Sequence, residues 1–218
     1  IWLKDYLQLD GLGYKLVPIK TPIGKKSLFD MGRIDPEKMY QNVQKWNWRN
    51  INDGKIYLDE QSKRNAISMR NSLMRLSSAF AVQGDTLKAI EILDLSLDKM
   101  PIKDFDHYSL SIEYPEMYYK LGAVEKARKS AETLIELFRE KLIWHSTFTK
   151  EEFDLVFEDF DLTFRYLYRG VLEQVQEYET DYDYFKKLQD EFNGTLELFQ
   201  HIIPNQETVP EDVELLQE

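Results

Sequence analysis

Residues 70–101, RNSLMRLSSAFAVQGDTLKAIEILDLSLDKMP, decide the fold of this chain. Apolar side chains recur there at intervals of three and four residues, the period of a helix with one buried face. Gly84-Asp85 separates two such stripes, and Pro101 ends the second. Two helices joined by so short a turn pack antiparallel, so the sequence predicts a helical hairpin. Its stripes are Ala66, Met69, Leu73, Leu76, Phe80 and Ala81, then Leu87, Ile90, Leu93, Leu97 and Met100.

A weaker copy of the pattern follows 38 residues later, around Gly122. Each glycine, Gly84 and Gly122, has an aromatic residue four positions before it and an alanine five positions after it. Glycine permits a left-handed turn, alanine lets the second helix approach closely, and the ring fills the space between the helices. These pairs are Phe80 and Ala89, then Tyr118 and Ala127. Self-similarity of this kind indicates repeated helix pairs.

The pattern resembles the tetratricopeptide repeat. The first-copy residues at that family's intervals are Leu73, Leu76, Phe80, Gly84, Ala89, Leu93 and Pro101. The second copy departs from the family, because Pro115 stands at a small-residue position and Arg139 replaces the closing proline. The resemblance implies an α-α superhelix in which residues 149–203 form a third pair without the signature. A generic helical bundle with a coincidental match is the alternative.

The first 60 residues do not share the helical period. Glycine and proline interrupt residues 1–34 too often for a long helix, and residues 14–17 fit a short strand or an extended arm. Asp35 and Pro36 predict a helix start, as N-cap and first helical residue. Residues 52–58 combine an Asn-Asp-Gly turn with a short β-like run. We therefore expect an N-terminal arm with a capping helix over residues 1–60.

More helices are expected after the hairpin. Residues 104–121 favour a helix that is kinked or split at Pro115, and residues 124–144 favour a long amphipathic helix. Thr149 and Glu152 form a capping box that opens a helix running to near Glu179. The buried face predicted for this helix consists of Phe153, Val156, Phe157, Phe160, Phe164, Tyr168, Leu172 and Val175.

The last predicted helix begins at Asp181 and stops before Pro204. Residues 204–218 contain five acidic residues and no basic one, so we expect a loose acidic tail. The predicted fold class is mainly α, with tetratricopeptide-like helix pairs over residues 61–203 and an irregular arm that contains one or two short strands.

Charge is distributed unevenly within the net charge of −11. Residues 1–149 carry 23 basic and 20 acidic side chains, whereas residues 150–218 carry 5 and 19. An acidic C-terminal third repels phosphate backbones and anionic lipid, so we expect no nucleic-acid partner. The absence of cysteine excludes disulfides and thiolate chemistry. No apolar run approaches the roughly 18 residues of a membrane span, so any membrane contact is expected through a parent segment.

A wider resemblance covers residues 5–105. The blocks DYLQLDGLGYKLVPIKTP, GRIDPEKMYQNV and KWNWRNINDGKIYLDE, followed by the hairpin, resemble the multi-pass protein O-mannosyltransferase-like (glycosyltransferase-C-like) bacterial membrane proteins of unknown function. Arg49 departs from the family, which has glycine there. The resemblance implies a soluble, extracytoplasmic (periplasmic) appendage whose parent holds the catalytic acidic residue in its membrane part. A first residue of Ile1 fits a piece of a longer precursor.

Catalytic and metal-binding patterns are not recognisable in this sequence. The three histidines, His107, His145 and His201, lie far apart and outside any metal-binding spacing. Adjacent carboxylates such as Glu151-Glu152 diverge by about 100° on a helix and do not converge on one substrate atom. Trp46 and Trp48 either stack on a sugar or peptide or anchor the arm onto the first helices. We expect no catalytic residue, no cofactor and no metal in this fragment.

Binding is the function that this sequence favours. In helical repeats, the first helix of each pair lines a concave groove, and the outward positions there bind extended peptides. The predicted partner-binding residues are Asn71, Met74, Ser78, Glu116 and Tyr119. The resulting hypothesis is a non-catalytic interaction module that presents or docks a polypeptide partner or acceptor. The alternatives are a glycan-active enzyme domain with carboxylates in a helical cleft, and a purely structural or dimerising domain. The oligomeric state is left open.

Overall fold

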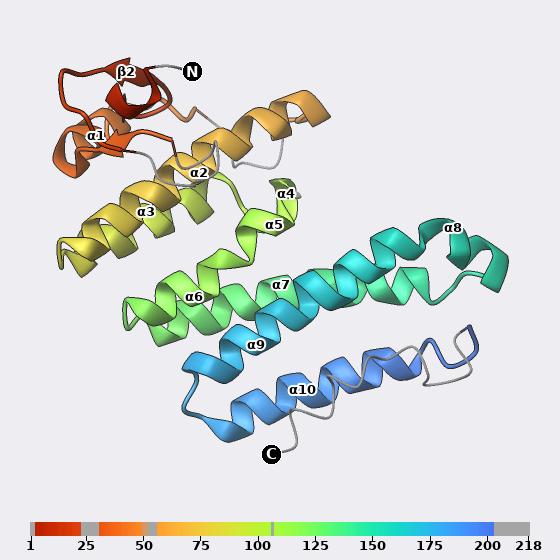
Figure 1. The fold of residues 1–218 in the computed structure, drawn as a ribbon. Coiled ribbons are helices and arrows are strands. Elements are labelled where there is room, and N and C mark those ends of the chain that lie inside the picture. The colour runs from red at the N-terminus through yellow and green to blue at the C-terminus, as the bar shows by residue number, and fades with distance from the viewer. Residues whose placement is uncertain (1–2, 23–30, 50, 52–55, 106, 203–218) are drawn as a thin grey trace. The chain divides into compact units, whose positions relative to one another are not determined.

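The chain is mainly α-helical, as predicted, with a short strand region near its N-terminus (Figure 1). The computed structural model describes residues 3–22, 31–49, 51, 56–105 and 107–202. The chain packs as two compact units, which we call unit 1 (residues 1–130) and unit 2 (residues 131–218). This division does not coincide with the predicted boundary at residue 60, and the predicted acidic tail lies outside the described residues.

The arm of unit 1 begins with the 3-10 turn η1 (Lys4–Tyr6) and forms a small sheet. Strand β1 (Leu7–Leu9) pairs antiparallel with β2 (Tyr14–Leu16) and parallel with β3 (Arg33–Ile34), in the order β2-β1-β3. β2 confirms the strand predicted at residues 14–17, whereas β1 and β3 were not predicted. The β-like run at residues 55–58 is wrong for its described part, because residues 56–58 are irregular.

Helix α1 (Pro36–Val43) begins as predicted at Asp35, whose side chain accepts a hydrogen bond from the Lys38 N–H at 3.3 Å. α1 packs against the helices that follow it. Tyr40 Oη donates to Glu91 at 2.9 Å, and Lys88 Nζ lies 2.7 Å from the Glu37 carboxylate. α1 therefore covers one end of the hairpin, as a capping helix does.

The predicted hairpin consists of α2 (Glu60–Val82) and α3 (Thr86–Lys99), which lie side by side (Figure 1). Gly84 between them has φ of +80°, a left-handed conformation that glycine adopts without strain. The N–H of Asp85 returns to the Phe80 carbonyl at 3.0 Å and satisfies a helix-end acceptor. Asp85 then caps α3 through the Lys88 N–H. One short turn thus ends one helix and starts the next.

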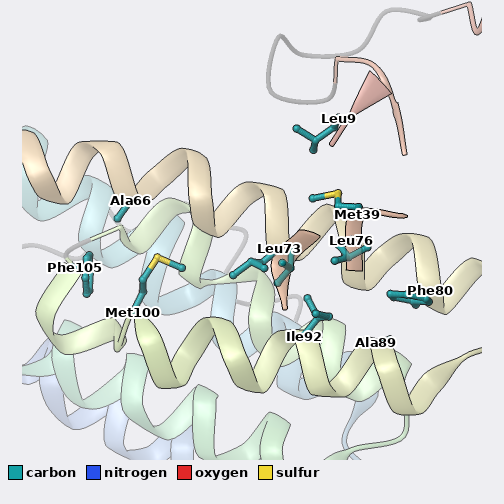
Figure 2. Close-up of a cluster of buried hydrophobic side chains, with 11 residues drawn as sticks. Leu9, Met39, Ala66, Leu73, Leu76, Phe80, Ala89, Ile92, Met100 and Phe105 are labelled. Carbon is teal, nitrogen blue, oxygen red and sulfur yellow. The ribbon is translucent and has the colours of Figure 1, made fainter. Parts of the chain in front are cut away.

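Small residues bring the two helices of the hairpin close together. Ala89 is fully buried, and Ser77 Oγ donates to its carbonyl at 2.8 Å. Figure 2 shows the core of unit 1 formed around this contact, with α1 and β1 contributing to it. Its members are Leu9, Met39, Val43, Ala66, Leu73, Leu76, Phe80, Ala89, Ile92, Met100 and Phe105.

The stripe predicted for α3 is partly wrong. Leu87 is exposed and Ile90 is only partly buried, whereas Ile92 and Ser96 are fully buried. The buried face is centred on Ala89 and Leu93, so it is rotated from the face that the larger apolar residues suggested. The reason is that close packing against α2 selects the small residue Ala89 rather than Leu87.

The region after α3 is split into short helices. α4 (Ile102–Phe105), α5 (Tyr108–Ser111) and α6 (Glu113–Lys120) follow one another, with Pro115 in the first turn of α6, where a missing N–H is tolerated. Gly122 has φ of +73° and precedes α7 (Val124–His145). Tyr118 Oη donates to Asp94 at 2.9 Å, and Lys126 pairs with the same carboxylate, so α3, α6 and the start of α7 are joined within unit 1.

Unit 2 contains the rest of α7, one long interrupted helix and a last helix. α8 (Lys150–Asp161) runs through the π-helical segment η3 (Leu162–Tyr168) into α9 (Arg169–Tyr178), and α10 (Tyr182–Glu197) follows. Thr149 and Glu152 form the predicted capping box. No helix in the described residues is both long and apolar enough to cross a bilayer.

Aromatic rings fill the core of unit 2. The Phe160 ring centroid lies 4.9 Å from that of Phe153 and 4.7 Å from that of Phe199, which follows α10. Phe164 stacks on Phe192 of α10 at 5.0 Å. Aromatic pairs at these distances stabilise a core beyond the area they bury. The inner face predicted for residues 149–179 is therefore mostly correct, although Phe157 lies at its edge and is half exposed.

Candidate interaction surface

The five predicted partner-binding residues all lie in unit 1 but not on one open face. Ser78 is exposed, Asn71 and Glu116 are partly buried, and Met74 and Tyr119 are buried. The outward orientation predicted for all five therefore holds for Ser78 and not for Met74 or Tyr119. Helices α2 and α6 bury wider faces than a repeat pattern assumes, so these two positions fall inside the core. A partner-binding role for the five residues stays a prediction.

Arg75 of α2 binds the N-terminal arm. Its guanidinium donates to the carbonyls of Met31 and Gly32, each at 2.9 Å, and to Tyr14 Oη at 3.2 Å. Arg75 is the neighbour of Met74 on α2. The N-terminal arm is consequently fastened to α2 at Arg75, which lies about 100° around the helix from Met74.

The tryptophans next to α1 pack on the core of unit 1. Trp46 and Trp48 have ring centroids 5.3 Å apart, and both are partly buried against the cluster in Figure 2. The Trp46 ring also passes 3.5 Å from the place where a side chain at Gly11 would begin. This packing fits the interpretation that the pair anchors the arm.

A buried polar cluster closes the far end of the hairpin. Arg70 is fully buried, donates to the Met100 carbonyl at 2.6 Å and stands 5.4 Å above the ring of Tyr114. Tyr114 Oη lies 2.6 Å from Ser96 Oγ, and burial raises the pKa of Tyr114. The guanidinium satisfies a carbonyl at the C-terminal end of α3. No part of this cluster reaches solvent, so it is structural rather than a binding site.

His145 is the most unusual titratable residue of unit 2. It is fully buried at the end of α7, and its Nε2 lies 3.0 Å from Asp159 Oδ2. Lys141 Nζ pairs with the other oxygen of Asp159 at 2.6 Å. Burial lowers the pKa of His145, although the carboxylate of Asp159 opposes that shift. Because the imidazole is enclosed, the arrangement fastens α7 to α8 and offers no base to a substrate.

The outer face of α8 and η3 presents the candidate interaction surface, which we call the α8 row. Leu155 is 86% exposed, Leu162 is 48% exposed and Tyr166 is 65% exposed. Leu155 and Leu162 are two helical turns apart, and Tyr166 follows one turn later, so the three side chains share a face. Apolar residues aligned in this way on a surface are typical of a protein-interaction site.

Acidic side chains accompany the α8 row. Glu151 and Glu158 are exposed on the same helical face, one turn before Leu155 and one turn after it. Within the described part of the chain, neither carboxylate forms an ion pair. The surface therefore offers apolar contact together with unneutralised negative charge.

The other side of the same helix is held rigidly. Phe160 and Phe164 stack with rings 5.7 Å apart, and Tyr168 meets Phe192 of α10 at 4.8 Å. Burial raises the pKa of Tyr168 to about 12. Leu162 and Tyr166 lie in the π-helical segment, a kind of irregularity that is frequent at functional sites. The helix that carries the α8 row is thus anchored by aromatic packing on its inner side.

The helical period predicts only the inner face of residues 149–179, so the α8 row falls outside that prediction. Leu155, Leu162 and Tyr166 are not part of the predicted inner face. The sequence does contain a sign of this surface: three apolar residues stand at helical spacing on the outer face of the helix, which is otherwise polar.

The chain matches no protein-family model, no curated protein sequence and no solved structure. No group of three or more histidine, aspartate and glutamate side chains in the described ranges could hold a metal ion. The candidate surface accordingly rests on the geometry of this chain alone.

Proposed function

We propose that this chain is a non-catalytic protein–protein interaction module whose α8 row docks a basic, apolar segment of a polypeptide partner. The observation that carries this proposal is the alignment of exposed Leu155, Leu162 and Tyr166 on one helix face with Glu151 and Glu158 between and beside them. An amphipathic helix with leucines on one face and lysines along its edges complements such a surface in both shape and charge.

The proposed module belongs to the tetratricopeptide-like helical repeats. The left-handed Gly84, the close contact of Ser77 with Ala89 and the buried Phe80 support one repeat at residues 70–101. In this proposal the chain is the soluble, extracytoplasmic appendage of a membrane protein that resembles the protein O-mannosyltransferases. That placement is supported by the order of sequence blocks over residues 5–105. The module positions a polypeptide acceptor or a partner subunit for the parent protein.

A defined peptide tests the docking surface. The probe is a synthetic fluorescent peptide with leucines at intervals of three and four residues and lysines on the flanking positions, titrated with the chain and followed by fluorescence anisotropy. The double variant Leu155→Ser/Tyr166→Ser removes the apolar contacts without adding charge, so we expect the affinity to fall at least about tenfold, which corresponds to about 1.4 kcal/mol. Raising the salt concentration should also weaken binding, because charge contributes to it.

Two controls separate this surface from general stickiness. Leu87→Ser changes a similarly exposed leucine in unit 1 and should leave the affinity unchanged. A scrambled peptide of the same composition cannot place its leucines on one helix face and should bind more weakly. Equal binding by the double variant, or equal binding of the scrambled peptide, would show that the α8 row is not the docking surface.

A further inference from the structure

The small sheet of unit 1 ends in a strand with one open edge. β2 is the outermost strand in the order β2-β1-β3, and none of the described residues pairs with its outer side. Tyr14 is 44% exposed and Leu16 is 59% exposed. An edge strand with exposed apolar side chains is a template for pairing with another strand.

The register of the hairpin shows which backbone groups face outward. The Val17 N–H donates to the Tyr6 carbonyl, and the Asp10 N–H donates to the Gly13 carbonyl, each at 2.9 Å. In an antiparallel pair, hydrogen-bonded positions alternate with positions that do not bond to each other. The pairs Leu7↔Leu16 and Leu9↔Tyr14 do not hydrogen-bond to each other. The N–H and C=O groups of Tyr14 and Leu16 therefore point away from β1, to the open edge.

We propose that β2 pairs with β2 of a second copy of this chain, forming a continuous six-stranded sheet across a two-fold axis at Lys15. This inference is independent of the proposed docking function, since it concerns unit 1 alone. In an antiparallel pairing centred on Lys15, Tyr14 lies opposite Leu16 of the other copy, and Leu16 lies opposite its Tyr14. Both pairs are hydrogen-bonded, so the outward groups of each strand are satisfied by the same groups of its copy.

The side chains of β2 fit this arrangement. Tyr14 and Leu16 lie opposite Leu9 and Leu7, on the face of the sheet where Leu9 is buried. Pairing places each exposed leucine beside a tyrosine ring of the other copy, an aromatic and aliphatic cross-strand contact that stabilises sheets. The apolar face of one sheet thus continues into the other.

Lys15 is the residue that would otherwise oppose pairing. Two lysines face each other across the axis, and like charges directly opposite destabilise a sheet. However, Lys15 Nζ lies 2.6 Å from the Asp10 carboxylate of its own chain, and the arrangement repeats in the copy. Each ammonium is therefore balanced locally. A three-residue ladder buries little area, so the dimer is weak and forms as the concentration rises.

The absence of cysteine makes a direct test available. In the variant Lys15→Cys, the two thiols lie opposite each other with Cα atoms about 4.5 Å apart, within the range that a disulfide spans. We expect a covalent dimer under mild oxidation, seen on non-reducing gels. Ile19→Cys is the control, because this exposed residue lies about four residues from the axis and its two copies are roughly 25 Å apart in an extended strand.

A second variant tests the backbone hydrogen bonds proposed between the two β2 strands. Leu16→Pro removes an N–H that makes no bond to β1, so the arm keeps its ladder while the outer edge loses a donor. Sedimentation equilibrium from about 10 μM to about 1 mM should show a dimer for the natural chain and for Leu16→Ala, and a monomer for Leu16→Pro. Circular dichroism checks that the variants stay folded.

Each outcome decides the inference. Rapid cross-linking of Lys15→Cys with slow cross-linking of Ile19→Cys supports the paired strands, as does loss of the dimer only in Leu16→Pro. A monomer at every concentration, a dimer that survives Leu16→Pro, or equal cross-linking at both positions overturns it. None of these results bears on peptide binding at the α8 row, so the two proposals fail separately.

Discussion

The two units solve the packing of a helix pair in different ways. In unit 1, α2 and α3 approach closely through Ser77 and Ala89, and the left-handed Gly84 makes the turn. In unit 2, α9 and α10 are joined without glycine. Glu179 accepts hydrogen bonds from the N–H groups of Thr180 and Asp181, and the Phe164 ring of η3, just before α9, stacks on Phe192 of α10. Close packing needs particular small residues at fixed places, whereas aromatic packing tolerates many sequences. A repeat signature can therefore be seen in one pair and not in the other.

The largest effect on this difference between the units is expected from removing an aromatic ring from the core of unit 2. Phe160→Ala deletes the ring that contacts Phe153, Phe164 and Phe199, and it leaves a cavity that rigid neighbours cannot fill. We expect the free energy of unfolding to fall by about 3–5 kcal/mol. Urea denaturation followed by circular dichroism measures it.

Phe157→Ala is the matched control for this prediction. The Phe157 ring is half exposed at the edge of the same cluster, so its removal should cost less than half as much. Equal losses for both variants would mean that the aromatic cluster does not act as a packed core.

Glycine to alanine substitutions should have opposite signs in the two units. At Gly84 the positive φ strains any side chain, so Gly84→Ala should destabilise the chain by about 1 kcal/mol. Gly170 lies within α9, with open space where a methyl group would stand. Gly170→Ala should therefore stabilise the chain by about 0.5–1 kcal/mol.

Thermal unfolding of these two variants compares the same chemical change in two backbone settings. Alanine meets no atom within 4 Å at either position, so contacts cannot explain a difference in sign. Two changes of the same sign would contradict the assignment of Gly84 as the residue that makes the turn.

Local features of the fold could be predicted from the sequence because their causes are local. Asp35, Gly84 and the Thr149–Glu152 capping box are recognisable from a few neighbouring residues, and all three are found in the structure. Strands β1 and β3 could not be predicted, because they pair with each other across a long stretch of sequence, and no local pattern encodes that pairing.

The candidate site was harder to predict for a related reason. Met74 is buried although the repeat pattern places it outward, and no spacing within α2 encodes this burial. The π-helical segment that presents Leu162 and Tyr166 likewise has no sequence signature. The α8 row could have been found by asking which apolar residues the inner face leaves over.

His145 provides a pH test that is specific to unit 2. Burial lowers the pKa of His145 in the folded chain, so the unfolded chain binds this proton more tightly. By linkage, the free energy of unfolding falls as the pH drops through the unfolded value of about 6.5, and the loss ends below the folded pKa. The variant His145→Asn should lose less stability than the natural chain between about pH 7.5 and about pH 5.5.

Chemical denaturation at each pH gives the free energy of unfolding of the natural chain and of His145→Asn. The slope of this free energy against pH is then compared between the two proteins. Asp159 and Lys141 are present in both proteins, so the comparison isolates the change at residue 145. Parallel slopes would mean that His145 becomes protonated without cost, which is incompatible with its enclosure.

The smallest expected effect concerns Arg49 in unit 1. Its φ of +47° is left-handed, and its N–H donates to Asn47 Oδ1 at 3.1 Å. A glycine there adopts the same conformation without strain, although it also loosens the unfolded chain. Arg49→Gly should therefore raise the free energy of unfolding by about 0.5 kcal/mol, detectable as a shift in the thermal midpoint. A decrease would show that the arginine side chain contributes more than its backbone costs.

The π-helical segment between α8 and α9 has a consequence for how this chain can change length. A π turn holds about one residue more than an α turn, so the seven residues of η3 absorb a surplus residue without ending the helix. Losing one residue there would convert η3 to regular α-helix and return the ladder to ordinary spacing. A single-residue deletion should consequently be tolerated better within η3 than elsewhere in this helix, which makes η3 the place where the phase between the two halves of a long helix can be adjusted.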